Sequence, residues 1–96
     1  MFKIVARMVV KKDKIADFKS TAKDLITKSQ NEEGNVFYTL NQDAKNEQNF
    51  AFIECWKDQE AMQIHGASEH FTKYFPLLAE MCESSDEMEL YTEIEF

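Results

Sequence analysis

The chain has 96 residues, a formal net charge of −7 at pH 7, 44% hydrophobic and 30% charged residues, two glycines and one proline. These values indicate one globular domain over residues 1–96 and exclude a disordered or low-complexity chain. Because an acidic chain repels phosphate groups, we expect neither nucleic acid nor a membrane surface as a partner. The early apolar runs are short and broken by Lys3 and Arg7, which argues against a membrane span or a signal peptide and favours a cytoplasmic protein.

The first half of the chain predicts a strand, a helix and a hairpin. Apolar residues alternate over residues 2–10, as in a strand whose two faces are both partly covered. Helical spacing follows up to about residue 30, with Asp13 as the expected N-cap. Residues 31–34 are expected to form the exit of the helix, where Gly34 is free to adopt a positive φ angle. Residues 35–41 and 49–56 alternate again, and the polar stretch between them predicts a hairpin.

The second half predicts a broken helical region and a last strand. Asp58 is expected to cap a short helix over residues 59–65 that Gly66 ends, and Ser68 to cap a second helix that continues past Pro76 to about Cys82. Residues 88–96 alternate, with one very acidic face. The order β-α-β-β-α-β predicts an α+β, ferredoxin-like fold with a four-stranded antiparallel sheet and helices on one side. The second sheet face carries apolar groups that need cover, so we expect a homodimer.

Residues 54–71 carry the best candidates for chemistry. His65 and His70 can exchange protons near neutral pH. Together with Trp56, Tyr38 and Tyr74 they could bracket a flat aromatic substrate. In the other interpretation the histidines are surface or capping residues and the aromatic side chains are core. Spacing alone leaves both interpretations open.

Other kinds of site have weaker support in the sequence. His65 and His70 are five positions apart with Gly66 between them, and no carboxylate or cysteine stands at a zinc-binding spacing, so we expect no metal site. No glycine-rich loop suits a phosphate or a dinucleotide, and no nucleophilic triad has a local signature. We interpret Cys55 and Cys82 as reduced, partly buried thiols.

The same segment carries a set of residues at a characteristic spacing: Glu54, Trp56, Ala61, His65, Ser68, His70 and Phe71. This set resembles the antibiotic-biosynthesis monooxygenase domain family, in its quinol-monooxygenase-like branch. The resemblance covers essentially the whole chain and implies a dimeric α+β barrel. The family includes cofactor-independent oxygenases of quinols or polycyclic phenols, haem-degrading enzymes and an isomerase of a small phosphorylated signal molecule. The resemblance therefore identifies a family more closely than a reaction.

For a quinol-type oxygenase, the resemblance implies that a base removes a phenolic proton and that the resulting anion reacts directly with O₂, without a cofactor. His65 is the first candidate for the base or hydrogen-bond partner, and His70 is the second. Arg7 qualifies as an anion-stabilising group only if its face of the first strand looks into the pocket. The candidate contacts of a small aromatic substrate are Trp56, Tyr38, Arg7, Phe71 and Tyr74.

Three alternatives follow from the same resemblance. The haem-degrading branch uses an Asn, a Trp and a His at places where this chain has Ala6, His65 and Phe75, so haem is disfavoured. An isomerase of a phosphorylated molecule needs a cationic group, for which only Arg7 and scattered lysines are available. A non-enzymatic ligand-binding or stress-related dimer would have a filled interior, in which Trp56 and the histidines are packed.

Overall fold

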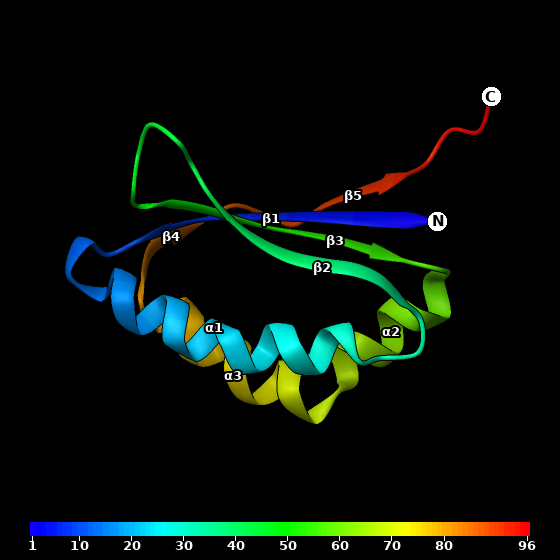
Figure 1. Cartoon of the computed structure of the whole chain (residues 1–96), viewed down its shortest axis with the longest axis horizontal. Coiled ribbons are helices and arrows are strands. Elements are labelled where there is room, and N and C mark those ends of the chain that lie inside the picture. Colours follow the sequence, from blue (N-terminus) through cyan, green and yellow to red (C-terminus); the bar gives the residue numbers. More distant parts are fainter.

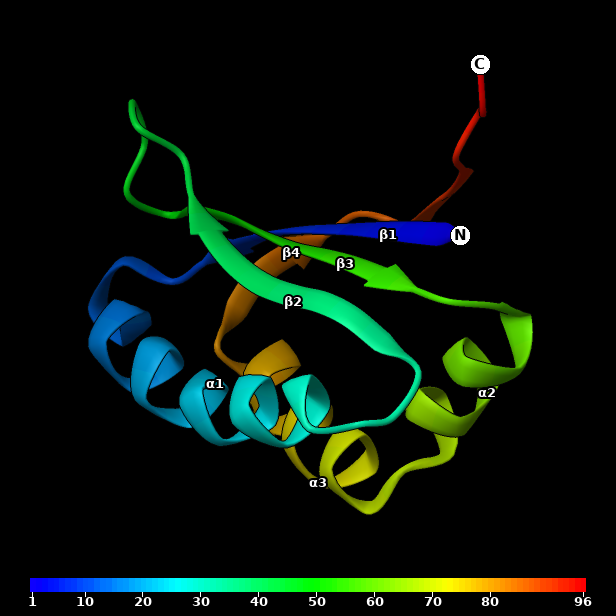
Figure 2. The same cartoon turned by 45° about the vertical axis from the view of Figure 1, so that its right-hand side comes forward.

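The computed structural model describes residues 1–96 and shows one antiparallel sheet with helices along one side (Figures 1 and 2). The strands are β1 (Phe2–Val10), β2 (Asn35–Gln42), β3 (Asn49–Trp56), β4 (Cys82–Ser85) and β5 (Glu89–Thr92). The helices are α1 (Ile15–Gln30), α2 (Gln59–Ala67) and α3 (Glu69–Glu80), with a short 3₁₀ turn, η1 (Lys12–Lys14), before α1. The strand order is β2-β3-β1-β4, and β5 also pairs with β1. The predicted ferredoxin-like α+β fold is confirmed.

Alternation along the central strand β1 decides which sheet face is buried. Ala6, Met8 and Val10 face the helices and are buried, whereas Arg7 between them is exposed. Strand β3 runs antiparallel to β1, with Phe50 opposite Met8. This register places the aromatic residues of β3 on the same sheet face as Met8. Since the period of a strand is two, this register gives the sheet one apolar face under the helices and one open face.

The start of α1 differs from the expectation for Asp13. Residues Lys12–Lys14 form the 3₁₀ turn η1, so Asp13 lies inside that turn, and Lys14 occupies the N-cap position without a side-chain cap. The expected cap at Asp13 is therefore wrong. The other two caps are confirmed: Asp58 Oδ1 accepts from the Ala61 N–H at 2.8 Å, and Ser68 Oγ accepts from the Phe71 N–H at 3.2 Å. Both satisfy backbone donors that a helix leaves free at its first turn.

The C-terminal region differs more. α3 contains Pro76 and ends at Glu80, and β4 begins at Cys82, where a helix was expected. β4 and β5 pair with the two ends of β1, so they act as one strand that is interrupted around Asp86. The expected strand over residues 88–96 is shorter, because β1 begins at Phe2, whose ladder partner is Thr92. The last backbone hydrogen bond on this side is from the Glu93 N–H to the Met1 carbonyl, at 3.1 Å. The last residues leave the sheet edge, as Figure 2 shows.

The two glycines also behave differently from the expectation. Gly66 does not end α2, which continues to Ala67. Gly34 has no positive φ angle, so it does not use the conformational freedom that a glycine has at a helix exit. Gly34 is instead required by a close approach, since a Cβ atom there would lie 2.3 Å from the Ala61 Cβ. The Lys57 N–H also donates to the Gly34 carbonyl at 3.0 Å, so the loop after α1 lies directly on the start of α2.

No helix of the chain is both long enough and apolar enough to cross a membrane.

Gly34→Ala should lower the free energy of unfolding by about 1–3 kcal/mol, because the added methyl group overlaps Ala61. Gly66→Ala is the matched control: its Cβ meets nothing within 4 Å. In a helix this control should raise the free energy of unfolding by up to about 1 kcal/mol. Urea denaturation of both variants measures the difference, and equal stability of the two would contradict the proposed close approach.

Candidate functional site

The loop between α1 and β2 carries Glu32 to the side of α2. The Glu32 N–H donates to the Ser29 carbonyl at 3.1 Å, and the Asn35 N–H donates to the Glu32 carbonyl at 3.0 Å. The approach of Gly34 to Ala61 then fixes this loop against α2. Because Ala61 and His65 are four residues apart, they lie on the same face of the helix. The loop therefore places the Glu32 carboxylate next to the His65 ring.

Glu32, His65 and His70 form a compact group, which we call the carboxylate–histidine cluster. Glu32 Oε2 lies 2.6 Å from His65 Nδ1 and 2.8 Å from His70 Nε2. The side chains are only 12%, 5% and 16% exposed, respectively. An ionised carboxylate can only accept, so each of these ring nitrogens carries a proton and donates it to the shared oxygen. This arrangement assigns the ring proton of His65 to Nδ1.

Ser68 holds the corner between α2 and α3 and thereby orients both histidines. Its hydroxyl donates to the His65 carbonyl at 2.6 Å and accepts from the Phe71 N–H. Its own N–H also donates to the His65 carbonyl, at 3.0 Å. One serine thus ends α2 behind His65 and begins α3 just before His70, so the two rings converge on Glu32 although they are five positions apart.

Aromatic rings enclose the other side of His65. Its ring centroid lies 4.5 Å from Trp56, 4.9 Å from Phe71 and 5.3 Å from Tyr38. The His65 Nε2 atom is buried among them and has no hydrogen-bond partner in the chain. With the proton on Nδ1, Nε2 is an unprotonated acceptor that faces an aromatic environment.

The pKa of His65 favours the neutral ring, in which Nε2 has no proton and can accept one. Burial lowers the pKa of His65 below its ordinary value, although the hydrogen bond and the negative charge of Glu32 oppose this change. A buried imidazole prefers the neutral form because the charged form loses its hydration. A neutral ring with a free Nε2 has the protonation state of a general base.

Glu54 is a second buried carboxyl on the helix-facing side of β3. Glu54 is 4% exposed, and its Oε1 atom accepts a hydrogen bond from the Trp56 Nε1–H group at 3.0 Å. Burial raises the pKa of Glu54 to about 7, the charge of Glu32 adds to this rise, and the Trp56 hydrogen bond opposes it. Glu54 therefore takes up or releases its proton near neutral pH, beside the Trp56 ring that contacts His65.

The structure places the remaining candidate residues differently. Tyr38 is fully buried, and burial raises its pKa above the ordinary value for tyrosine. Phe71 stacks on Phe75 beside His65. Tyr74 lies apart from the cluster, with its hydroxyl 3.5 Å from Asp24 Oδ2. The cluster therefore brings together His65, His70, Trp56, Tyr38 and Phe71, but leaves Tyr74 outside.

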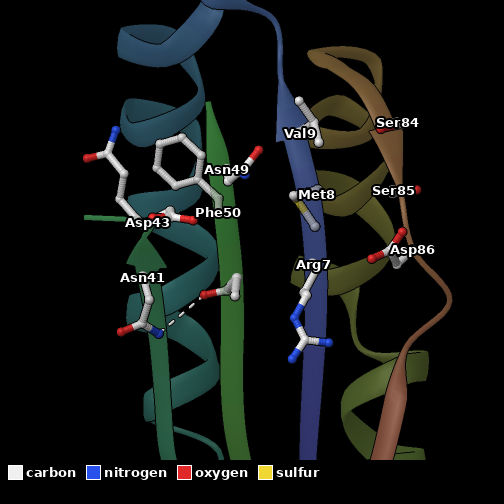
Figure 3. A pocket seen from close by; sticks show the side chains of 12 residues that line it. Arg7, Met8, Val9, Asn41, Asp43, Asn49, Phe50, Ser84, Ser85 and Asp86 are labelled. Carbon is white, nitrogen blue, oxygen red and sulfur yellow. Dashed lines mark hydrogen bonds between the residues drawn. The ribbon is translucent and has the colours of Figure 1, made fainter. Parts of the chain in front are cut away.

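Arg7 lies on the open face of the sheet, with the helices behind the strands (Figure 3). It forms an ion pair with Glu89 and lines a hollow of about 330 Å³ together with residues such as Asn41 and Asp86. Within one chain the sheet separates Arg7 from His65. Arg7 was a candidate for stabilising an anion only if its face of β1 looked into the pocket, and within one chain it looks the other way.

A second hollow, of about 270 Å³, reaches the cluster at Glu32, on the side away from the aromatic rings that surround His65. Glu32 lines it, but Trp56, Tyr38 and His65 line neither hollow. The aromatic side of His65 is packed in this conformation, so a flat substrate must displace side chains to reach Nε2. The residues around the second hollow are Glu32, Glu33, Gly34, Lys57, Asp58, Glu60, Ala61 and Ile64.

Two carboxylates in this region had no assigned role in the sequence. Glu54 interrupts an apolar strand face formed by Phe50, Phe52 and Trp56, and a carboxylate in such a position is a signal of a buried acid. Glu32 gave no such signal, because it lies in a polar turn and meets His65 only through tertiary structure. With Glu32 included, two imidazoles and a carboxylate converge, and these are ligand types for a divalent metal.

The fold and the site define a ferredoxin-like α+β domain with a carboxylate–histidine cluster under its sheet. The sequence profile of the family described as "Antibiotic biosynthesis monooxygenase" matches residues 1–77. A protein of Bacillus subtilis (strain 168), "Putative monooxygenase YcnE", is 38% identical over 71 residues, which are 74% of this chain and 75% of that protein. The chain belongs to the antibiotic biosynthesis monooxygenase family.

Solved structures agree with this assignment. The crystal structure of a conserved protein from Methanosarcina mazei Go1 has a TM-score of 0.93 at 32% identity, covering 97% of this chain and 92% of that chain. A crystal structure described as an antibiotic biosynthesis monooxygenase has a TM-score of 0.92 at 30% identity, covering 99% of this chain and 100% of that chain. The family and the fold are thus supported by sequence and by structure together.

Glu54→Gln should change how stability depends on pH. Folding raises the pKa of Glu54 to about 7, so between the unfolded-state pKa and pH 7 the folded protein holds a proton that the unfolded chain has lost. The free energy of unfolding therefore falls as the pH rises through about 7. Gln accepts the Trp56 hydrogen bond but does not ionise. Between about pH 5 and pH 8 the wild type should lose about 2 kcal/mol relative to the variant. Denaturant unfolding of both proteins measures this difference, and parallel pH profiles would contradict a buried, titrating Glu54.

Proposed function

We propose that the protein is a cofactor-independent monooxygenase that oxidises a quinol or a polycyclic phenol with O₂, with His65 as the general base. One observation carries this proposal: Glu32 holds the Nδ1 side of His65, which leaves Nε2 as a free acceptor among Trp56, Tyr38 and Phe71. Membership of the family supports the reaction class. The substrate class and the use of O₂ are part of the proposal.

The proposed reaction begins with transfer of the phenolic proton to His65 Nε2. The resulting imidazolium is stabilised by Glu32, as a carboxylate stabilises the histidine of a catalytic triad. The electron-rich phenolate then gives its electrons to O₂. In an anthrone-like substrate a CH₂ group becomes C=O, so one oxygen atom remains on that carbon and the other leaves as water with the two hydrogen atoms. The aromatic side chains exclude water and hold the flat substrate in position.

His70 has a supporting role in this scheme. It donates to the same Glu32 oxygen that accepts from His65, so it fixes the carboxylate from the opposite side. A carboxylate with two donors keeps its position when the charge on His65 changes during turnover. His70 is therefore a positioning residue, and His65 is the catalytic one.

The packed interior favours a second candidate function, a non-enzymatic ligand-binding or stress-related dimer. Trp56 and Tyr38 are fully buried, and neither hollow reaches the aromatic side of His65. An isomerase of a phosphorylated molecule has less support, because Arg7 lies on the other sheet face and Lys57 is the one cation that lines the second hollow.

We also propose that two chains pair through the open face of the sheet. This face carries apolar side chains that the helices leave uncovered, including Phe37, which is 38% exposed. The C-terminal segment extends beyond β5 (Figure 2), and its Ile94 and Phe96 side chains are exposed. Burying these groups would be favourable. Sedimentation at twice the chain mass of 11.3 kDa would support the dimer, and a monomer at every concentration would exclude it.

Oxygen uptake by purified, chelator-treated protein tests the oxygenase directly, with a panel of quinols and anthrone-like phenols as substrates. We expect uptake well above autoxidation, and a loss of about 10²- to 10⁴-fold in His65→Ala, because the base is removed. His65→Gln is the second variant, since its amide can still donate to Glu32 but has no titratable nitrogen. Glu69→Gln, at an exposed residue next to His70, is the control and should match the wild type.

Two outcomes would change the assignment. Unchanged turnover in folded His65→Gln would remove His65 from the role of base. No uptake above autoxidation with any compound would favour the ligand-binding dimer.

A further inference from the structure

The geometry points to a divalent-cation site of the Zn²⁺ class, formed by Glu32 Oε2, His65 Nδ1 and His70 Nε2. These three atoms lie within 4.8 Å of one another and come from three separate segments of the fold. Two imidazoles and one carboxylate are the protein ligands of several catalytic zinc sites. The cation site does not depend on the oxygenase proposal, because it uses the opposite side of the His65 ring.

The distances are compatible with an ion after a small expansion. The two nitrogen–oxygen distances are 2.6 and 2.8 Å, which are hydrogen-bond lengths. Ligand atoms about 2.0–2.2 Å from a tetrahedral Zn²⁺ stand about 3.3 Å from each other. Each pair therefore has to separate by roughly half an ångström. The partly exposed His70 side chain leaves room for such a movement.

Two further observations point to a ligand at this place. Glu32 Oε1 is buried and has no hydrogen-bond partner, which is costly for a carboxylate oxygen. An ion held by Oε2 is within reach of Oε1 as well, so a bidentate carboxylate would satisfy it. The second hollow leads to Glu32 from solvent and carries four acidic side chains against one lysine, so it attracts cations: Glu32, Glu33, Asp58, Glu60 and Lys57.

The donor set also selects the class of ion. Imidazole nitrogen with carboxylate oxygen suits Zn²⁺ and its neighbours Co²⁺, Ni²⁺ and Cu²⁺, whereas Mg²⁺ and Ca²⁺ prefer oxygen ligands alone. Both rings have to be neutral to bind the ion, so metal affinity falls as the pH is lowered. The ring proton of each histidine then moves to the nitrogen that does not bind the ion.

Cation binding has a consequence for the neighbouring chemistry. An ion on Nδ1 puts the His65 proton on Nε2, which turns a free acceptor into a donor. A bound cation and a basic Nε2 therefore exclude each other. Any activity that uses Nε2 as a base would be inhibited by the same ions that bind the cluster.

Binding itself is the test, and it needs no turnover. The full chain, treated with a chelator, is titrated with Zn²⁺ by calorimetry and with Co²⁺ by visible absorption. We expect one ion per chain with micromolar or tighter affinity and a Co²⁺ spectrum of nitrogen and oxygen ligation. Glu32→Gln and His70→Gln should each weaken binding at least about tenfold, whereas Glu69→Gln should bind like the wild type. Circular dichroism confirms that each variant is folded.

Three results would overturn the cation site. The first is the lack of saturable binding of either ion by the folded wild type. The second is equal affinity in the wild type, Glu32→Gln and His70→Gln. The third is a sulfur-to-cobalt charge-transfer band, which would place the ion on Cys55 or Cys82. None of these results bears on oxygen uptake by the metal-free protein, so the two proposals can fail separately.

Discussion

The contact between Gly34 and Ala61 determines where Glu32 meets His65. It brings the backbone of Gly34 so close to the methyl group of Ala61 on α2 that no side chain larger than a hydrogen atom fits at Gly34. Glu32, two residues earlier, then meets His65, four residues beyond Ala61 on the same helix face. An α+β domain of this size has few places where a charged group can be buried. The Gly34–Ala61 contact provides such a place for the Glu32 carboxylate, within hydrogen-bond distance of both histidines.

The carboxylate–histidine cluster is stable because its charges and donors match. Glu32 carries the negative charge, and two imidazole N–H groups share one of its oxygen atoms. Burial keeps His65 neutral, so the proton that it donates to Glu32 stays on Nδ1 and the lone pair on Nε2 faces the aromatic rings. The same three side chains would suit a cation if the protons move. The cluster therefore links two properties, basicity on one side of His65 and cation affinity on the other.

The sequence was sufficient for the features that depend on local patterns. Alternation along β1 and β3 predicted the two strands but left open which face of β1 looks towards the pocket, and the caps at Asp58 and Ser68 were predictable because their side chains act within one helical turn. The cap expected at Asp13 is a local feature that failed, because Lys12–Lys14 form a 3₁₀ turn. The other features that the sequence missed depend on contacts between distant segments. Nothing near Glu32 indicates that Ala61 will pack on Gly34, and the end of the last strand depends on where β1 begins. The spacing of His65 and His70 gave no sign that the two rings converge, because they lie on different helices and meet at Glu32, which comes from elsewhere in the chain.

The protonation state of His65 tests the central claim most directly. Long-range ¹H–¹⁵N NMR spectra of the chelator-treated protein report which ring nitrogen carries the proton. We predict that His65 is neutral at pH near 7, with the proton on Nδ1 and none on Nε2, and that this preference weakens in Glu32→Gln. A proton on Nε2, or a doubly protonated ring, would contradict the account, because the group that faces Trp56 and Tyr38 would then be a donor and not a base.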